Sequence, residues 1–181
     1  GTVTDSLSVI RTHVFGSGKA TMDDVRAAMA ADWKGYETLR ALAKNRTPLF
    51  GNDDDEADAL AKRVFDAFIK SVEGDGERRM AKRGAPYRAN FLSTTCHVYF
   101  GGKTAASPDG RKAGEPLSDG TSPSHGADKA GPTDAMKSLA KRDQARTGGP
   151  APNQSFTQSA LSGETRPRDL KNKRMKHRTR K

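Results

Sequence analysis

A long stretch rich in glycine and proline restricts the folds that this chain can adopt. Residues 101–131 contain seven glycines, and prolines stand at positions 108, 116, 123 and 132. Proline has no amide hydrogen to donate, so neither a continuous helix nor a central strand is expected here. A loop of this length is uncommon in a compact domain, and an ordered one usually carries function on a rigid scaffold.

Helical periodicity marks the segments on both sides of this loop. Thr21 has the form of an N-cap, and Asp23 and Asp24 fall in the first turn of the following helix, where the helix dipole favours acidic residues. An acidic run at 53–56 opens the longest helix, which Gly74 ends. The expected helices cover residues 5–15, a segment beginning at Thr21, residues 36–44, residues 52–74 and residues 133–142.

Residues 91–100 alternate between polar and apolar side chains as a β-strand does. Ser93, Thr95 and His97 fall on the more polar face of this predicted strand, and Cys96 falls on the other. Cys96 is the single cysteine, so an internal disulfide is excluded. We expect it to be a buried structural thiol, because free cysteines behave as small hydrophobic residues.

The composition adds limits on location and partners. Hydrophobic residues make up only 33% of the 181 residues, which is low for an independently folded domain with a formal net charge of +10. Residues 164–181 hold nine basic and two acidic side chains, so we expect a disordered basic tail after a nearly neutral body. No apolar run approaches the roughly 20 residues of a membrane helix. We expect no membrane contact and, from the single cysteine, a reducing cytoplasm.

Three patterns that resemble cofactor or metal sites fail on their spacing. Residues 16–19 read Gly-Ser-Gly-Lys, but Ala20 stands where a phosphate loop has a Mg²⁺-binding hydroxyl. The acidic residues at 53–58 lack the spacing and the glycine of a calcium loop. The four histidines have no metal-ligand spacing. We therefore expect this chain to bind no metal and no cofactor.

Many glycine, proline and aspartate residues in the loop and its flanks occur at fixed spacings from one another. They are found in 106–120 (ASPDGRKAGEPLSDG), Ser122-Pro123, Gly126-Ala127-Asp128, Gly131-Pro132-Thr133, 33–37 (WKGYE), 51–54 (GNDD) and 94–101 (TTCHVYFG). This pattern resembles the glycyl radical enzymes, the superfamily of pyruvate formate-lyase. The resemblance covers about residues 2–163, as an internal section of a longer chain, and residues 94–101 are most similar to the hydroxyproline and diol dehydratase branch.

The resemblance implies an α/β fold, namely a partial section of a ten-stranded α/β barrel. That section would hold N-terminal helices, one or two strands, the long Gly/Pro-rich loop and a disordered basic tail. It also implies an anaerobic radical lyase or dehydratase, or a formate acyltransferase, acting on a small-molecule substrate. Its glycyl radical would be installed by a radical-SAM activating enzyme and would pass to a cysteine.

The motifs that carry this radical chemistry in the family are missing from the sequence. The family's reactive cysteine lies in a Gly-Cys-Val-Glu type motif, whereas Cys96 is followed by His97 and Val98. No glycine stands in the Arg-Val-Ala-Gly-Tyr type motif that stores the radical. We therefore assign no catalytic residue and expect this chain to be inactive alone.

The resemblance places the predicted strand beside the substrate pocket. Thr95 is the residue that we favour for substrate contact, with Ser93, His97 and Thr94 as further candidates. The alternative is an ordinary strand whose hydroxyls bond locally. In the loop, the residues expected to hold its shape are Asp109, Gly110, Arg111, Asp119, Gly120 and Asp128.

The resemblance weakens towards the end of the chain. Residues 148–157 are similar to a family strand, but Pro150 and Pro152 replace residues that a sheet ladder needs. A shifted reading frame or a truncated gene would produce the basic sequence that follows. We therefore divide the chain into a family segment, 1–163, and a basic tail, 164–181.

Two alternatives to an enzyme segment stay open. The first is a non-catalytic remnant that pairs with a complementary chain carrying the missing motifs. The second is a small basic protein that binds a polyanion through its tail. Nucleic acid is not the expected partner, because the tail has no interleaved aromatic residues and the chain has no recognisable nucleic-acid module.

Overall fold

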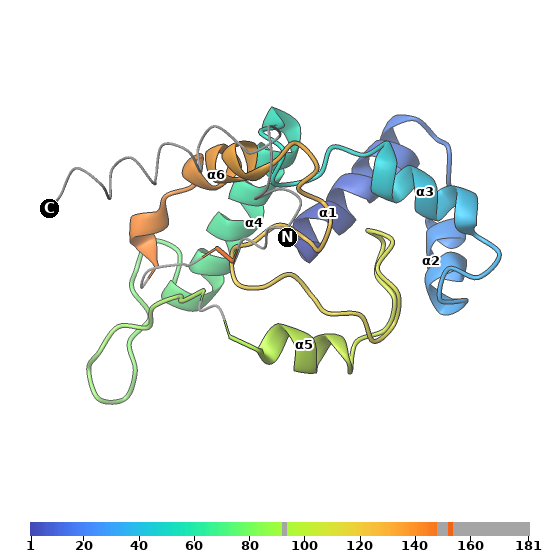
Figure 1. Ribbon diagram of the computed structural model, residues 1–181. Helices are drawn as coiled ribbons and strands as arrows, with labels where there is room; N and C mark the ends of the chain where they lie inside the picture. Colours follow the sequence, from blue (N-terminus) through green and yellow to red (C-terminus); the bar gives the residue numbers. More distant parts are fainter. Residues whose placement is uncertain (92–93, 148–151, 154–181) are drawn as a thin grey trace, which may run out of the picture.

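The computed structural model describes residues 1–91, 94–147 and 152–153, and the regular structure of this part is helical (Figure 1). No β-strand forms within it, although Met80 and Pro86 make an isolated antiparallel bridge. No helix of this part is long and apolar enough to cross a membrane. The elements are α1 (Thr2–Val9), the π-helical segment η1 (Ile10–Gly16), α2 (Met22–Ala30), α3 (Glu37–Asn45), α4 (Asp55–Glu73), α5 (Cys96–Gly101), α6 (Pro132–Ala140) and the 3₁₀ turn η2 (Gln144–Arg146).

The helix ends follow the capping signals in the sequence. Thr21 Oγ1 accepts a hydrogen bond from the Asp24 N–H at 3.1 Å, and Asp24 Oδ2 accepts one from the Thr21 N–H at 2.8 Å, which makes a capping box. Asp54 Oδ1 accepts two backbone N–H bonds at the start of α4, and Gly74, with a φ of 103°, ends that helix. The helices predicted on both sides of the loop are confirmed, but the first begins at Thr2, before the predicted start at residue 5, and is π-helical from Ile10 to Gly16.

Helix α4 is the central element of the packing. The ring of Phe65 is buried on this helix and stacks on the ring of Phe91, with centroids 5.2 Å apart. Ala61, one turn earlier, forms a second buried cluster with Phe50 and Leu139, so α6 lies along α4 (Figure 1). Each fully buried phenylalanine of this kind stabilises the fold by about 2 kcal/mol.

An ion cluster joins the end of α6 to the start of α4. Lys141 Nζ lies 2.8 Å from carboxylate oxygens of Asp55 and Asp58 and 2.9 Å from one of Asp53. These hydrogen bonds, that to Asp55 above all, hold the pKa of Lys141 well above its ordinary value. The Asp58 side chain is only 1% exposed, so removing Lys141 would leave a buried carboxyl group without its ion-pair partner.

The loop between α5 and α6, residues 102–131, lies across the other helices and is attached to them by hydrogen bonds (Figure 1). Trp33 makes one of these: its indole N–H donates to the Arg111 carbonyl at 3.2 Å. The Trp33 side chain is buried although its φ is 64°, a conformation that is strained for a bulky residue, so packing must hold it there. Further attachments include those that join Ser118 to Thr2, Gly110 to Arg40, Ala127 to Asn52 and Thr121 to Arg142.

The prediction of a β-strand over residues 91–100 is wrong, because α5 occupies the second half of this range. The N–H of Tyr99 bonds the Thr95 carbonyl within the helical segment. A strand needs backbone partners from a neighbouring strand, and the described residues offer none, so local helical bonds take their place. Gly101 then lets the loop return against α5, since a Cβ at this position would lie only 2.5 Å from the Glu115 carbonyl oxygen.

Several expectations fall on residues that the structure does not describe. Ser93 is one of them, and the basic tail, 164–181, is another. The second strand-like segment, 148–157, is described only at residues 152–153. These expectations stay predictions.

The capping box at the start of α2 yields a test of local stability. We expect Thr21→Ala to lower the free energy of unfolding by about 1 kcal/mol, because the Asp24 N–H loses its acceptor. Urea denaturation followed by circular dichroism measures the change. Thr38→Ala, at an exposed position near the start of α3, is the matched control and should change stability much less. Equal losses in the two variants would contradict the capping role.

Candidate functional site

The candidates for substrate contact lie at the start of α5. Thr94 and Thr95 are exposed, and His97 is partly buried. The Thr94 hydroxyl accepts a bond from the Cys96 N–H at 3.4 Å, whereas the Thr95 hydroxyl makes no hydrogen bond to any described residue. Thr95, the favoured candidate, therefore presents a free donor and acceptor next to His97.

His97 lies next to an aspartate of the loop, whose nearer oxygen, Oδ1, makes no hydrogen bond within the described residues. Its Nδ1 lies 2.7 Å from the Thr94 carbonyl oxygen and 3.5 Å from Asp119 Oδ1. Because both neighbours are acceptors, Nδ1 carries the hydrogen, and in the neutral ring Nε2 is left with a lone pair. Asp119 is 6% exposed, its other oxygen accepts from the Asn153 amide, and the His125 ring stacks on His97 with centroids 5.9 Å apart. The sequence marked His97 and Asp119 separately, but nothing in their spacing indicated that they meet.

Cys96 differs from the expectation for it. The thiol was expected to be a buried structural group, but the residue is exposed in the first turn of α5. The expectation assumed a strand with an apolar face, and the helix removes that face.

Arg111 is the residue that holds the loop together. It is 4% exposed, and its guanidinium donates to the carbonyls of Glu115 at 2.6 Å, Lys112 at 3.1 Å and Ala105, as well as to the Ser107 hydroxyl at 3.1 Å. The Ser107 hydroxyl in turn donates to Asp109 Oδ1 at 2.5 Å, so the buried charge reaches a carboxylate through one hydroxyl. Such a network stabilises only when each member is satisfied, which fixes the path of the loop.

The other loop residues marked from the sequence are placed as follows. Asp109 is buried and caps the Arg111 N–H at 3.4 Å. Gly110 and Gly120 have φ values of 85° and 50°, which favour glycine. Asp128 is half-buried near Gly51.

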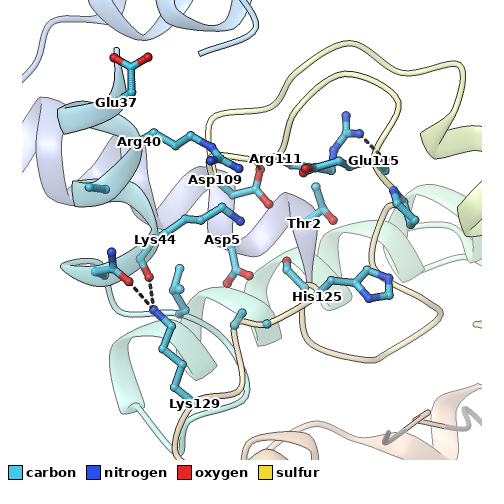
Figure 2. A pocket seen from close by; sticks show the side chains of 17 residues that line it. Thr2, Asp5, Glu37, Arg40, Lys44, Asp109, Arg111, Glu115, His125 and Lys129 are labelled. Carbon is cyan, nitrogen blue, oxygen red and sulfur yellow. Dashed lines mark hydrogen bonds between the residues drawn. The ribbon is translucent and has the colours of Figure 1, made fainter. Parts of the chain in front are cut away.

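A polar cavity of about 710 Å³ lies between α1, α3 and the loop (Figure 2). Figure 2 shows Arg40 and Lys44 reaching from α3 towards Asp109 and Asp5. Arg40 Nε donates to the Gly110 carbonyl at 2.8 Å. Sequence reasoning missed this cavity. The spacing of Arg40 and Lys44, four residues apart on one helix face, is the signal that was available.

Asp5 lies at the bottom of this cavity. It is 1% exposed, and Oδ1 accepts a hydrogen bond from the Phe50 N–H at 2.9 Å. Burial raises the pKa of Asp5, while the nearby Ser124 hydroxyl and the Phe50 N–H act against the rise. Neither Asp5 Oδ2 nor Ser124 Oγ has a well-formed hydrogen bond within the described part of the chain.

Metal binding finds no support in this arrangement. Within residues 1–91, 94–147 and 152–153, no three His, Cys, Asp or Glu side chains are placed to hold a metal ion.

Two family models match the chain. The pyruvate formate lyase-like model matches residues 1–101, more than half of the chain, and the glycine radical model matches residues 117–176. The chain therefore belongs to the pyruvate formate lyase-like family of glycyl radical enzymes. The residues matched by the glycine radical model do not include an Arg-Val-Ala-Gly-Tyr motif.

Curated relatives are much longer than this chain. Trans-4-hydroxy-L-proline dehydratase of Clostridioides difficile is 44% identical over 164 residues, which cover 91% of this chain and 20% of the relative. Isethionate sulfite-lyase of Desulfovibrio desulfuricans is 39% identical over 170 residues, with the same coverage of both chains. The chain thus spans about a fifth of the length of these relatives.

Solved structures agree with the family assignment. The hydroxyproline dehydratase of Clostridioides difficile, solved with trans-4-hydroxy-L-proline bound, superposes with a TM-score of 0.85 at 43% identity, covering 95% of this chain and 21% of that one. The B12-independent glycerol dehydratase of Clostridium butyricum gives 0.80 at 37% identity, covering 94% and 21%. The fold is therefore that of a section of these barrel enzymes, to which the described residues contribute helices and the loop.

Replacement of the buried guanidinium tests the role of Arg111. We expect Arg111→Lys to lower the free energy of unfolding by about 2–3 kcal/mol, because a lysine ammonium cannot reach all the acceptors that the planar group satisfies. Hydrogen exchange should also become faster for the amides of residues 104–117. Arg83→Lys, at an exposed position, is the control. Unchanged exchange in the loop of the Arg111 variant would refute this role.

The buried carboxyl of Asp5 predicts a pH dependence. Because the pKa of Asp5 is raised in the folded chain, the unfolded chain ionises first as the pH rises. The free energy of unfolding therefore falls as the pH rises from the unfolded pKa to the folded pKa. Asp5→Asn keeps an oxygen acceptor for the Phe50 N–H and removes this loss. The variant should therefore gain stability relative to the wild type as the pH rises above the ordinary pKa of an aspartate, in urea denaturation at each pH. The exposed control Asp23→Asn should show no such gain, and a gain towards low pH would contradict the assignment.

Proposed function

We propose that this chain supplies part of the substrate-pocket wall of a radical dehydratase or lyase. The observation that carries the proposal is the free hydroxyl of Thr95, two residues before an imidazole, His97, whose Nδ1 lies 3.5 Å from Asp119 Oδ1, in a chain of this family. The relatives named above include dehydratases of hydroxyproline and glycerol and a lyase that acts on isethionate. Hydroxyproline, glycerol and isethionate are all small molecules that carry a hydroxyl group, which supports a small, polar organic substrate for this chain as well. We place this activity in an anaerobic and cytoplasmic setting.

The radical chemistry itself would come from outside the described residues. A glycyl radical, installed by a radical-SAM activating enzyme, would supply the hydrogen abstraction. The sequence contains neither the Cys-x-Glu motif nor the radical-glycine motif, so this function needs a protein part that holds both. A complementary chain is one such source.

The residues at the start of α5 would bind and orient the substrate. The Thr95 hydroxyl is able to donate to, or accept from, a substrate hydroxyl. His97 Nε2 is able to accept or donate a proton near a leaving group, while the Thr94 carbonyl accepts a hydrogen bond from Nδ1 and orients the ring. These residues would act together with the radical and would not replace it.

A chimera tests this proposal. Residues 1–147 would replace the matching section of the Clostridioides difficile trans-4-hydroxy-L-proline dehydratase, which keeps its own remaining sequence. After activation we expect a glycyl radical signal by electron paramagnetic resonance, together with dehydration of trans-4-hydroxy-L-proline. In this chimera, Thr95→Val should lower kcat/KM at least tenfold without changing the radical yield.

Thr133→Val is the control, because this exposed threonine lies in α6. A chimera that holds the radical but turns over no substrate would refute the proposed pocket wall. An active chimera that tolerates Thr95→Val would refute the role of Thr95 alone.

A further inference from the structure

The cavity between α1, α3 and the loop contains two neighbouring polar groups, the Asp5 carboxyl and the Ser124 hydroxyl, whose mutual contact falls short of a well-formed hydrogen bond. Asp5 is nine-tenths or more buried, yet its Oδ2 makes no well-formed hydrogen bond in the described part of the chain, and the same holds for Ser124 Oγ. Both residues line the cavity. A buried polar atom without a partner costs roughly 1–3 kcal/mol, so a ligand that supplies one would bind favourably here.

Two cations stand on the opposite wall of this cavity (Figure 2). Arg40 uses Nε for the Gly110 carbonyl, which leaves its two terminal nitrogens for other acceptors. Lys44 Nζ forms neither a hydrogen bond nor an ion pair with the described residues, although its carbonyl accepts from Lys129. An ammonium and a guanidinium on one helix face are suited to a carboxylate.

Each of the remaining acidic groups of the cavity has one carboxylate oxygen engaged; in Glu37 it is Oε1, which accepts from the Gly35 N–H at 3.0 Å. Asp109 Oδ1 accepts from Ser107 and from the Arg111 N–H, and Glu115 Oε2 accepts from the Lys112 N–H at 3.0 Å. The buried acceptor that lacks a well-formed hydrogen bond on this side, within the described part of the chain, is Asp5 Oδ2, beside the Ser124 hydroxyl. This arrangement favours a ligand with a negatively charged group that contacts Arg40 and Lys44 and a hydroxyl group that contacts Asp5.

We propose that this cavity binds a small hydroxy acid. Its carboxylate contacts Lys44 and Arg40, and its hydroxyl contacts Asp5 Oδ2 and Ser124 Oγ. Thr94, Thr95 and His97 do not line the cavity, although His125, whose ring stacks on His97, does. The site therefore adjoins the proposed substrate wall, but its residues are different and the inference does not depend on that proposal.

The test uses the 181-residue chain and glycolate as the probe. Glycolate titration, followed by amide chemical shifts, should shift the signals of residues 124–127 and 44–45 and saturate. Ethylene glycol, which lacks the carboxylate, and ethanolamine, which carries the opposite charge, should bind at least tenfold more weakly. Equal binding of either compound would overturn the proposal.

Variants test the residues that are assigned to the ligand. Lys44→Met should weaken glycolate binding at least tenfold, and Ser124→Ala should weaken it severalfold. Lys34→Met, which removes an exposed lysine outside the cavity, should leave it unchanged. If Lys44→Met fails to fold by circular dichroism, Lys44→Gln takes its place. Unchanged affinity in a folded Lys44 variant would also overturn the proposal.

Discussion

The buried guanidinium of Arg111 is the interaction on which the ordered loop depends. A charge in this position is tolerated only because carbonyl oxygens and one hydroxyl surround it, with the carboxylate of Asp109 one step away. The same loop carries the acceptor for Trp33, the acceptor for Arg40 and the carboxylate that meets His97. By holding the shape of the loop, this one buried cation supports both the candidate site at α5 and the wall of the polar cavity that the loop provides.

Much of the helical part could be predicted from the sequence, because its signals are local. The capping box at Thr21 and the glycine at the end of α4 act within a few residues of the structure that they specify. The strand over 91–100 could not be judged in the same way. Alternation of polar and apolar residues describes a sheet only when a neighbouring strand supplies backbone partners, and that is a property of the surroundings.

The candidate site was predictable to a similar degree. The resemblance marked Thr95, His97 and the loop residues, since family motifs are read in sequence order. The proximity of His97 to Asp119 and the placement of Asp5 near Lys44 were not predictable. These residues lie far apart in sequence: the path of the loop brings Asp119 to His97, and the packing of α1 and α3 places Asp5 and Lys44 around one cavity. Cys96 shows the opposite case, where a general tendency to burial was overridden by an exposed helix.

The short range of the bonds made by Arg111 has a consequence for how the chain folds. The partners of its guanidinium lie one to six residues away in sequence, so these hydrogen bonds close only very short loops. Contacts of such low sequence separation form with little loss of loop entropy and need no other helix to be in place. The turn around Arg111 therefore has the means to assemble early, and the helices would then dock onto a segment whose shape is already set.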